Sequence, residues 1–322
     1  MLIINRASFC NILLGTSIST LLLETSTKNN NDVLLQASQE VRKRVALTIQ
    51  TEPQLAGSLL RLAFHDAVTM DQHKTNTGGG SDFDNPYGAN GSIRYEISWS
   101  ENRGLQKPLS YVEELAQDFQ NQLSFADVLA LSGAAAVEAA HGPHITIRLG
   151  RSDVTQEDVR MLTKPIVKGD RSDVTTSLPS AALDSLGLRT FFSRLNLSEA
   201  ELVALMGAHD LGRHVTLTDM PRDCLRNLTR TCLDNAPVSV PFVTADPDTF
   251  SNLYYKKLLQ WNDRTINRGE AAFIPTDVAL VVDDGLQKWV RRFAGDEKLF
   301  FRTFVRAYQK IVDRTATTVA GY

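Results

Sequence analysis

Residues 61–66 read RLAFHD and residues 207–213 read GAHDLGR, and these two short segments decide how the chain is interpreted. In the first, Arg61 precedes His65 by four residues, so on a helix both side chains lie on one face, one turn apart. In the second, His209 lies near the end of an amphipathic segment. Together the two histidines indicate one cofactor held between two helices.

Most of the chain around these segments has the periodicity of helices. Val33–Gln50 repeats apolar residues at helical spacing, and Pro53 can occupy the first turn of the next helix. Ser198 and Glu201 form a capping box, and the helix that they start places His209 on an apolar stripe that faces the core. Further helices are expected over Leu109–Phe119, Phe125–Glu138, Phe250–Leu259, Asp284–Phe293 and Glu297–Val312.

Strand-like alternation is confined to His144–Leu149, and three segments rich in turn-forming residues, 78–91, 151–180 and 216–248, are predicted to be loops. The predicted fold class is therefore mainly α. A length of 322 residues with 43% hydrophobic content suits one large domain or two lobes around a shared core.

The charge balance indicates the class of partner, and the cysteine count limits the possible disulfides. A net charge of -3, from 34 basic and 37 acidic residues, gives no bias toward nucleic acid or an anionic membrane, so we expect small-molecule partners. Three cysteines are too few for a disulfide framework. Cys224 and Cys232 either close a small loop in an oxidising compartment or are two unrelated thiols, and we favour the second.

Residues 1–31 differ from the rest of the chain. Arg6 precedes a mostly apolar stretch from Phe9 to Leu23 that is interrupted by Ser, Thr and Gly. The stretch is too short and too polar for stable membrane insertion. Its basic, acid-poor, Ser/Thr-rich composition is typical of a targeting segment. The alternative is a frayed N-terminal helix.

Alone, His209 reads as a core histidine satisfied by a backbone carbonyl, and Arg61 with His65 reads as a surface pair. The other motifs along the chain change this interpretation. Seven segments occur in order between about Ser58 and Asp313, over roughly four fifths of the chain: LRLAFHDA (60–67), NGSIR (90–94), ENRGL (101–105), SFADVL (124–129), LGR (149–151), LMGAHDLGR (205–213) and IPTDVAL (274–280). One such motif is weak evidence, but seven in order are highly specific.

This series resembles the haem peroxidases of the plant, fungal and bacterial superfamily, nearest to the class I ascorbate and cytochrome c peroxidases and their ascorbate-peroxidase-related relatives. The resemblance implies a two-lobed fold with haem b between a distal and a proximal helix. Residues 32–322 would form the peroxidase domain, with a distal lobe over about 32–150 and a proximal lobe over about 180–315. Because the nearest plant relatives are plastidial, residues 1–31 would direct the chain to a plastid, to the stroma or the thylakoid lumen, with secretion as the alternative.

On the distal side, the resemblance implies that His65 takes a proton from hydrogen peroxide and returns it to the leaving oxygen. Arg61 would stabilise the charge developing on that oxygen, and Asn102 would accept a hydrogen bond from His65. Phe64 would line the haem, where class I members usually carry tryptophan. Since catalase-peroxidases rely on that tryptophan, strong catalase activity is not expected.

On the proximal side, the resemblance implies that His209 ligates the haem iron and that Asp277 accepts a hydrogen bond from its other ring nitrogen. The alternative for Asp277 is a helix cap after Pro275. His214 lies one residue before the position that binds a haem propionate in class I, so it would bind the propionate or simply be exposed. Asp127 and Arg151 match a buried ion pair and are expected to be structural.

Two features of the proximal stretch depart from the family. The tryptophan that carries the radical in cytochrome c peroxidase has no counterpart, because Val243 stands there, with Phe242 as the neighbouring candidate. The second oxidising equivalent would then stay on the porphyrin, which favours a small organic donor over a protein donor. The arginine that holds ascorbate falls in a lengthened stretch after His209 and has no assigned position, so ascorbate is not assigned as the donor.

Some relatives bind a structural cation near the proximal helix, and five positions here match that site. Two carboxylates among hard oxygen ligands suit calcium better than potassium. The alternative is a polar loop with no ion. The five residues are Asp210, Thr244, Asp246, Thr249 and Ser251.

The leading hypothesis is therefore a haem peroxidase that removes hydrogen peroxide at the expense of a small organic donor. A non-catalytic haem-binding or structural homologue is the first alternative. A non-haem metalloprotein that uses His65, Asp66, His209 and Asp210 is the second, but the chain has no HExxH-like pair.

Overall fold

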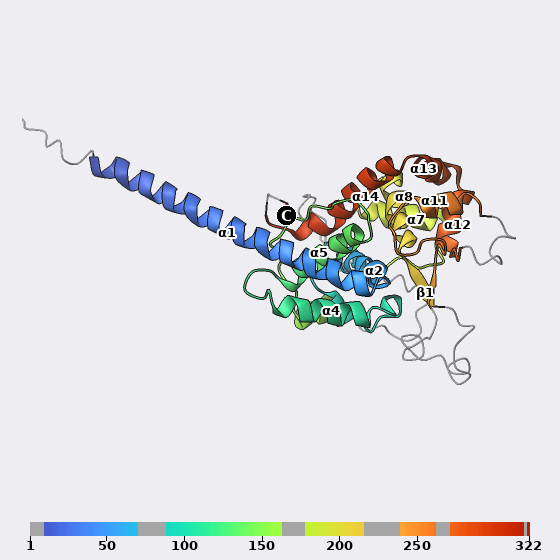
Figure 1. The fold of residues 1–322 in the computed structure, drawn as a ribbon, viewed down its shortest axis with the longest axis horizontal. Helices are drawn as coiled ribbons and strands as arrows, with labels where there is room; N and C mark the ends of the chain where they lie inside the picture. Colours follow the sequence, from blue (N-terminus) through green and yellow to red (C-terminus); the bar gives the residue numbers. More distant parts are fainter. Residues whose placement is uncertain (1–9, 70–87, 163–177, 216–238, 262–270, 319–320) are drawn as a thin grey trace, which may run out of the picture.

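The computed structural model describes residues 10–69, 88–162, 178–215, 239–261, 271–318 and 321–322. Helices dominate these ranges, as predicted, and they gather in two groups (Figure 1). The first group, blue to green, contains α1 (Cys10–Thr51), α2 (Leu55–Val68), α4 (Gln106–Gln117) and α5 (Phe125–Ala139). The second, yellow to red, contains α7 (Ser185–Arg194), α8 (Glu199–Met206), α11 (Leu253–Leu258), α12 (Pro275–Val282) and α13 (Asp284–Gly295). Helix α14 (Glu297–Val312) packs against both α8 and α2 and joins the groups.

Helix α5 is the centre of the first group. Every residue from 125 to 137 is buried, as expected for a helix that is apolar on all sides. Ser124 caps it by accepting a hydrogen bond from the Asp127 amide at 3.0 Å. Gly133 allows α2 to approach, because a Cβ there would lie 2.6 Å from the Cβ of Ala63. This contact holds α2, and with it His65, against α5.

Helix α8 begins with the predicted capping box. The Ser198 amide donates to Glu201 Oε2 at 2.8 Å, and the Glu201 amide donates to Ser198 Oγ at 3.3 Å. The helix ends at Met206, and the chain tightens into a 3-10 turn, η3 (Gly207–Asp210). His209 thus lies on η3, and the prediction that it continues the α-helical stripe is wrong. Its side chain is one quarter exposed.

Helix α2 and the end of η3 approach each other closely at one point. A Cβ on Gly57 would lie 2.1 Å from the carbonyl oxygen of Leu211, so only glycine permits this approach. His65 follows Gly57 by eight residues, about 12 Å along the helix axis. The two histidines therefore lie on separate elements that meet at Gly57 and Leu211.

Several other local predictions also differ from the structure. Helix α1 begins at Cys10 rather than near Val33, and its N-terminal part projects away from the two groups (Figure 1). His144–Leu149 forms no strand within the described residues, since Arg148 makes only a single bridge to Gly321. The described strands are β1 (Arg213–Val215) and β2 (Ser239–Pro241), an antiparallel pair in which His214 is opposite Val240.

The shorter elements complete the described chain. They are α3 (Ile93–Glu96), η2 (Ser100–Asn102), α6 (Gln156–Leu162) and η5 (Asp313–Thr315). Helix α6 lies inside the stretch 151–180, which was predicted to be a loop. Helix α11 begins at Leu253, three residues later than predicted.

The predicted ion pair between Asp127 and Arg151 is present and buried. Arg151 Nη1 donates to Asp127 Oδ1 at 2.8 Å, and Nη2 donates to Asp313 Oδ1 at 3.0 Å. Arg151 also donates to the Val312 carbonyl. This cluster ties the loop after α5 to the end of α14, which supports a structural role.

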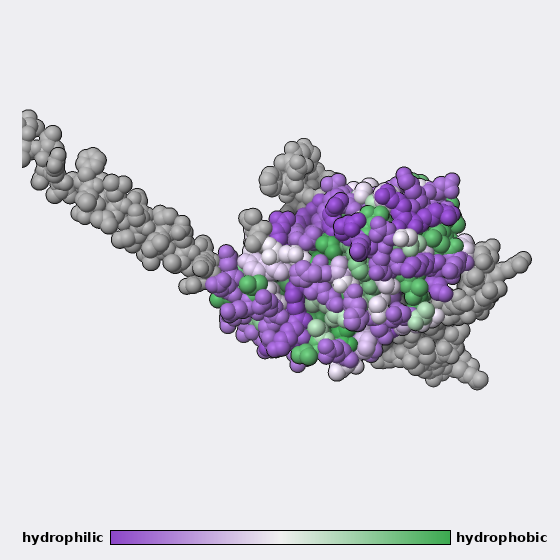
Figure 2. Space-filling view, turned by 45° about the horizontal axis from the view of Figure 1, so that its top comes forward, coloured by the Kyte–Doolittle hydropathy of each residue, from purple (hydrophilic) through white to green (hydrophobic). Residues whose placement is uncertain are grey.

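The surface shown in Figure 2 is mostly hydrophilic, with small apolar patches between charged residues. Among the described residues, no helix carries an apolar stretch long enough to cross a membrane.

Candidate active site

The distal histidine is held by an amide. His65 Nδ1 lies 2.7 Å from Asn102 Oδ1, and Asn102 Nδ2 donates to the Glu96 carbonyl at 2.9 Å. Because the amide nitrogen is used on a carbonyl, its oxygen must accept, so His65 carries its proton on Nδ1. His65 Nε2 is then an unprotonated base. The predicted contact between His65 and Asn102 is thus present in the structure.

The electrostatic surroundings keep this base neutral. Burial lowers the pKa of His65 to about 3, and the positive charge of Arg61 acts in the same direction. The hydrogen bond that His65 donates to Asn102 opposes the shift but does not reverse it. His65 therefore stays uncharged across the physiological pH range and can accept a proton.

Arg61 is anchored by the segment that supplies Asn102. Its Nη1 donates to the Arg103 carbonyl at 3.0 Å, and its Nη2 donates to the Glu101 carbonyl. The residue is exposed, and desolvation of its guanidinium together with the positive charge of Arg103 lowers the pKa of Arg61 to about 10. Arg61 remains cationic at neutral pH and keeps further N–H donors free for a ligand.

The proximal histidine is held by a carboxylate. His209 Nδ1 lies 2.6 Å from Asp277 Oδ1, and Asp277 is fully buried. Asp277 Oδ2 accepts the Ile274 amide at 2.9 Å, so the carboxylate also caps α12. The carboxylate therefore makes both predicted contacts, with His209 and with the start of the helix. The arrangement leaves His209 Nε2 free to bind a metal.

A tyrosine that the sequence did not single out shares this carboxylate. The Tyr254 hydroxyl donates to Asp277 Oδ1 at 2.7 Å. Tyr254 is fully buried, and burial together with the charge of Asp277 raises the pKa of its hydroxyl well above its usual value. It therefore remains a donor. Its place on the apolar stripe of α11 made it look like an ordinary core residue.

Phe242, and not Val243, lies against the proximal histidine. The rings of Phe242 and His209 stack with centroids 4.1 Å apart and planes 10° apart. Val243 is buried and forms a bridge with Ala271. Of the two candidates for the position of the missing tryptophan, Phe242 is therefore the one whose ring contacts His209.

The five residues of the predicted cation site lie in different surroundings, and Asp210 already accepts hydrogen bonds from the chain. Asp210 Oδ2 accepts from the Ser251 amide at 2.6 Å, and Oδ1 accepts from the Tyr254 amide at 2.8 Å. Thr244 and Asp246 are exposed. Burial raises the pKa of Asp210 to about 7. Within the described residues, no group of three or more His, Cys, Asp or Glu side chains is placed to hold a metal.

The remaining predicted residues have less defined positions. Phe64 is half-buried and its ring lies 6.0 Å from that of His65. The backbone of His214 lies in β1, but its side chain is outside what the structure describes. Cys224 and Cys232 also lie outside the described residues.

The donors on the two elements fit a haem group. A single imidazole with free Nε2 and a carboxylate behind Nδ1 is the usual proximal set for haem iron. Half-buried Phe64 and Ala208 stand next to the two histidines in sequence and supply apolar surface for a flat ring. The other histidine, His65, contacts the neutral amide of Asn102, which suits a base rather than a second strong iron ligand.

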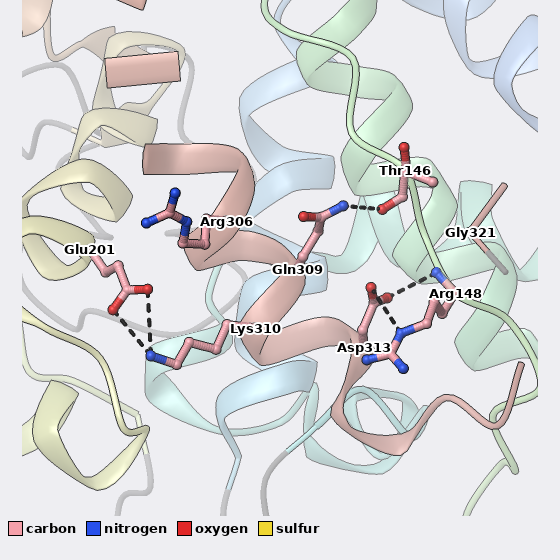
Figure 3. Close-up of a pocket in the computed structure, with 8 residues that line it drawn as sticks. All are labelled: Thr146, Arg148, Glu201, Arg306, Gln309, Lys310, Asp313 and Gly321. Atoms are coloured by element: carbon pink, nitrogen blue, oxygen red, sulfur yellow. Dashed lines mark hydrogen bonds and ion pairs between the residues drawn. The ribbon is translucent and has the colours of Figure 1, made fainter. Parts of the chain in front are cut away.

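A separate surface hollow of about 530 Å³ contains none of these residues (Figure 3). Its charged groups are largely paired within it. Lys310 Nζ lies 3.2 Å from Glu201 Oε2, and Arg148 Nε lies 3.8 Å from Asp313 Oδ2. We assign no part of the proposed reaction to it.

The comparisons with known proteins agree on one family. The model of the family described as "Peroxidase" matches residues 41–296. The chain is 34% identical over 281 residues to "Putative L-ascorbate peroxidase 6" of Arabidopsis thaliana, an alignment that covers 86% of this chain and 67% of the relative. It is 32% identical over 256 residues to "L-ascorbate peroxidase 5, peroxisomal" of the same plant, with coverages of 79% and 74%.

A fungal relative extends the series. The chain is 31% identical over 292 residues to "Cytochrome c peroxidase, mitochondrial" of Cryptococcus neoformans, with coverages of 85% and 67%. Two histidines on facing elements, one backed by an amide and one by a carboxylate, agree with these matches. The chain therefore belongs to the peroxidase family, as a class I haem peroxidase, an oxidoreductase that acts on hydrogen peroxide.

Proposed function

We propose that this chain binds haem b through His209 Nε2 and reduces hydrogen peroxide to water with electrons from a small organic donor, so removing peroxide from its compartment. The observation that carries the proposal is that the Nδ1 atoms of the two histidines contact different groups, an amide at His65 and a carboxylate at His209. The carboxylate of Asp277 raises the basicity of one imidazole for iron, whereas the amide of Asn102 leaves the other as a neutral base.

Each distal residue has one step in this proposal. His65 Nε2 takes a proton from one peroxide oxygen and returns it to the other, so that the departing oxygen leaves as water. Arg61 stabilises the negative charge that develops on the departing oxygen. Asn102 holds the His65 ring so that Nε2 faces the substrate. The bound haem supplies the iron and the two electrons for breaking the O–O bond, and the donor returns those electrons.

The test is an absorption spectrum of the haem-reconstituted protein before and after one equivalent of hydrogen peroxide. We expect a Soret band that shifts on mixing. A band that peroxide leaves unmoved would favour the non-catalytic homologue, and failure to take up haem would overturn the proposal.

The proximal ring stack supports a small donor. Phe242, one of the two candidates for the position at which cytochrome c peroxidases use a tryptophan, stacks on His209, and a phenyl ring is much harder to oxidise than an indole. Turnover with phenolic donors or ascorbate should therefore exceed turnover with reduced cytochrome c. Faster oxidation of cytochrome c than of every small donor would contradict this part of the proposal.

We also propose a structural cation at Asp210, Thr244, Asp246, Thr249 and Ser251, which would have to displace bonds that the oxygens of Asp210 accept from the chain. Calcium should raise the melting temperature of the protein but not that of Asp210→Asn. No calcium response in the wild-type protein would remove the cation.

We further propose that residues 1–31 direct a catalytic domain of residues 32–322, with the lobe limits given above, into a plastid. The basic, acid-poor composition of the segment supports this, whereas the relatives above are named peroxisomal and mitochondrial. A fluorescent protein fused to residues 1–31 should enter plastids. Entry into the secretory pathway would support the alternative, and mitochondrial import would contradict both.

A further inference from the structure

The proximal carboxylate receives two hydrogen bonds on the same oxygen. His209 Nδ1 approaches Asp277 Oδ1 at 2.6 Å and the Tyr254 hydroxyl approaches it at 2.7 Å. The other oxygen, Oδ2, is occupied by the Ile274 amide at 2.9 Å. The histidine and the tyrosine therefore compete for the charge of one atom.

Tyr254 is held in this position from two sides. Its amide donates to Asp210 Oδ1 at 2.8 Å, and Asp210 directly follows His209 in the chain. Its ring packs edge-on against Tyr255, with centroids 5.0 Å apart, and against Phe273 at 5.9 Å. Because the side chain is fully buried, water has no ready access to replace its hydroxyl.

Competition at Oδ1 has a definite sign. A carboxylate oxygen that accepts a second hydrogen bond gives up part of its charge to that bond and binds the first donor less strongly. The Nδ1–H bond of His209 is then less polarised, and the imidazole donates less electron density through Nε2. Weaker donation disfavours the ferric state of a bound iron relative to the ferrous state.

We infer that Tyr254 is a positioning residue that weakens the hold of Asp277 on His209 and so raises the reduction potential of the iron. The inference rests on the proposed function, in which His209 is the iron ligand. It adds to that function a residue whose hydroxyl sets the strength of the iron–histidine bond without touching the iron.

The experiment compares Tyr254→Phe with Tyr255→Phe in the haem-reconstituted protein. The control is matched, because Tyr255 is also fully buried and adjacent, but its hydroxyl donates to the Val203 carbonyl at 2.8 Å instead of to Asp277. Two quantities are measured: the iron–histidine stretching band of the ferrous protein by resonance Raman spectroscopy, and the ferric/ferrous reduction potential.

We expect Tyr254→Phe to move the band to higher frequency and the potential to a lower value, with Tyr255→Phe leaving both near wild type. A fluorinated tyrosine at position 254, a stronger donor, should move both quantities the other way. The fluorinated variant still tests the inference if Tyr254→Phe does not take up haem.

The outcomes separate the two ideas. An iron–histidine band in the wild-type protein that neither Tyr254 variant moves would overturn the inference and leave the proposed function intact. Absence of that band from the wild-type protein would instead show that His209 is not the ligand. Equal shifts in Tyr254→Phe and Tyr255→Phe would mean that any lost buried hydroxyl has this effect, and the inference would fall.

Discussion

At His65 the Nδ1 atom lies 2.7 Å from a neutral amide oxygen, whereas at His209 it lies 2.6 Å from a carboxylate oxygen. The distances are nearly the same, but the charge behind each ring differs by a full unit. An amide orients an imidazole without raising its proton affinity much, while a carboxylate also adds negative charge to it. The difference teaches that the partner of Nδ1, rather than the histidine, decides whether a ring moves protons or binds metal.

The largest expected effect comes from removing the base. His65→Leu should retain haem but slow the reaction with hydrogen peroxide by about 10²- to 10⁴-fold, because no other described group is placed to transfer the proton. Stopped-flow absorption at the Soret band measures this rate. His144→Leu is the control, since it removes an exposed imidazole that pairs with Glu138. Equal rates in wild type and His65→Leu would remove His65 from the mechanism.

Making the proximal side resemble the distal side should have the next largest effect. Asp277→Asn replaces the carboxylate by an amide of the same shape, so His209 loses the charge behind its ring. We expect haem affinity or the peroxide rate to fall by about 10- to 100-fold. Haem titration and stopped-flow mixing measure the two quantities. Asp283→Asn, an acidic helix cap paired with Arg189, is the control and should change neither.

The third test concerns the free energy of unfolding of the haem-free chain. The folded pKa of His65, about 3, lies below the unfolded value near 6.5, so the unfolded state binds the proton first as the pH falls. Between pH 7 and pH 5 this linkage should cost about 2 kcal/mol of stability.

His65→Leu removes that contribution, and denaturant titration at both pH values measures the difference. If wild type and His65→Leu lose the same stability between pH 7 and pH 5, His65 is not neutral in the folded chain.

The smallest effect at neutral pH is expected from making the distal side resemble the proximal side. Asn102→Asp puts a carboxylate behind His65, which raises the pKa of the ring. The peroxide rate should then fall with acidity at a higher pH than in wild type, with a change of only a few fold at pH 7. Asn102→Ala removes the acceptor without adding charge. A pH profile that is the same in Asn102→Asp and Asn102→Ala would refute the electrostatic explanation.

The sequence predicted best where local chemistry decides the structure. Helix α14 has the predicted limits, Glu297–Val312, because Asp296 caps it and its apolar stripe is continuous. The contacts of His65 with Asn102 and of His209 with Asp277 followed from motifs that keep their order along the chain. Each of these depends on short spacings that can be read directly.

The remainder depends on tertiary contacts. Phe242 rather than Val243 stacks on His209, because the Phe242 amide bonds to the Gly212 carbonyl at 3.0 Å and sets the register. Which oxygen of Asp277 receives Tyr254 depends on how α11 packs against η3, and no spacing in the sequence states it. The prediction of a strand at His144–Leu149 is wrong because, among the described residues, this stretch makes only a single bridge, from Arg148 to Gly321.

Arg61 bonds to the carbonyls on both sides of Asn102, while Asn102 itself holds His65. Residues 101–103 therefore hold both the cationic Arg61 and the base His65 in position. A displacement of residues 101–103 would misplace Arg61 and His65 together. A substitution that disturbs this segment should therefore remove both contributions to peroxide cleavage at once.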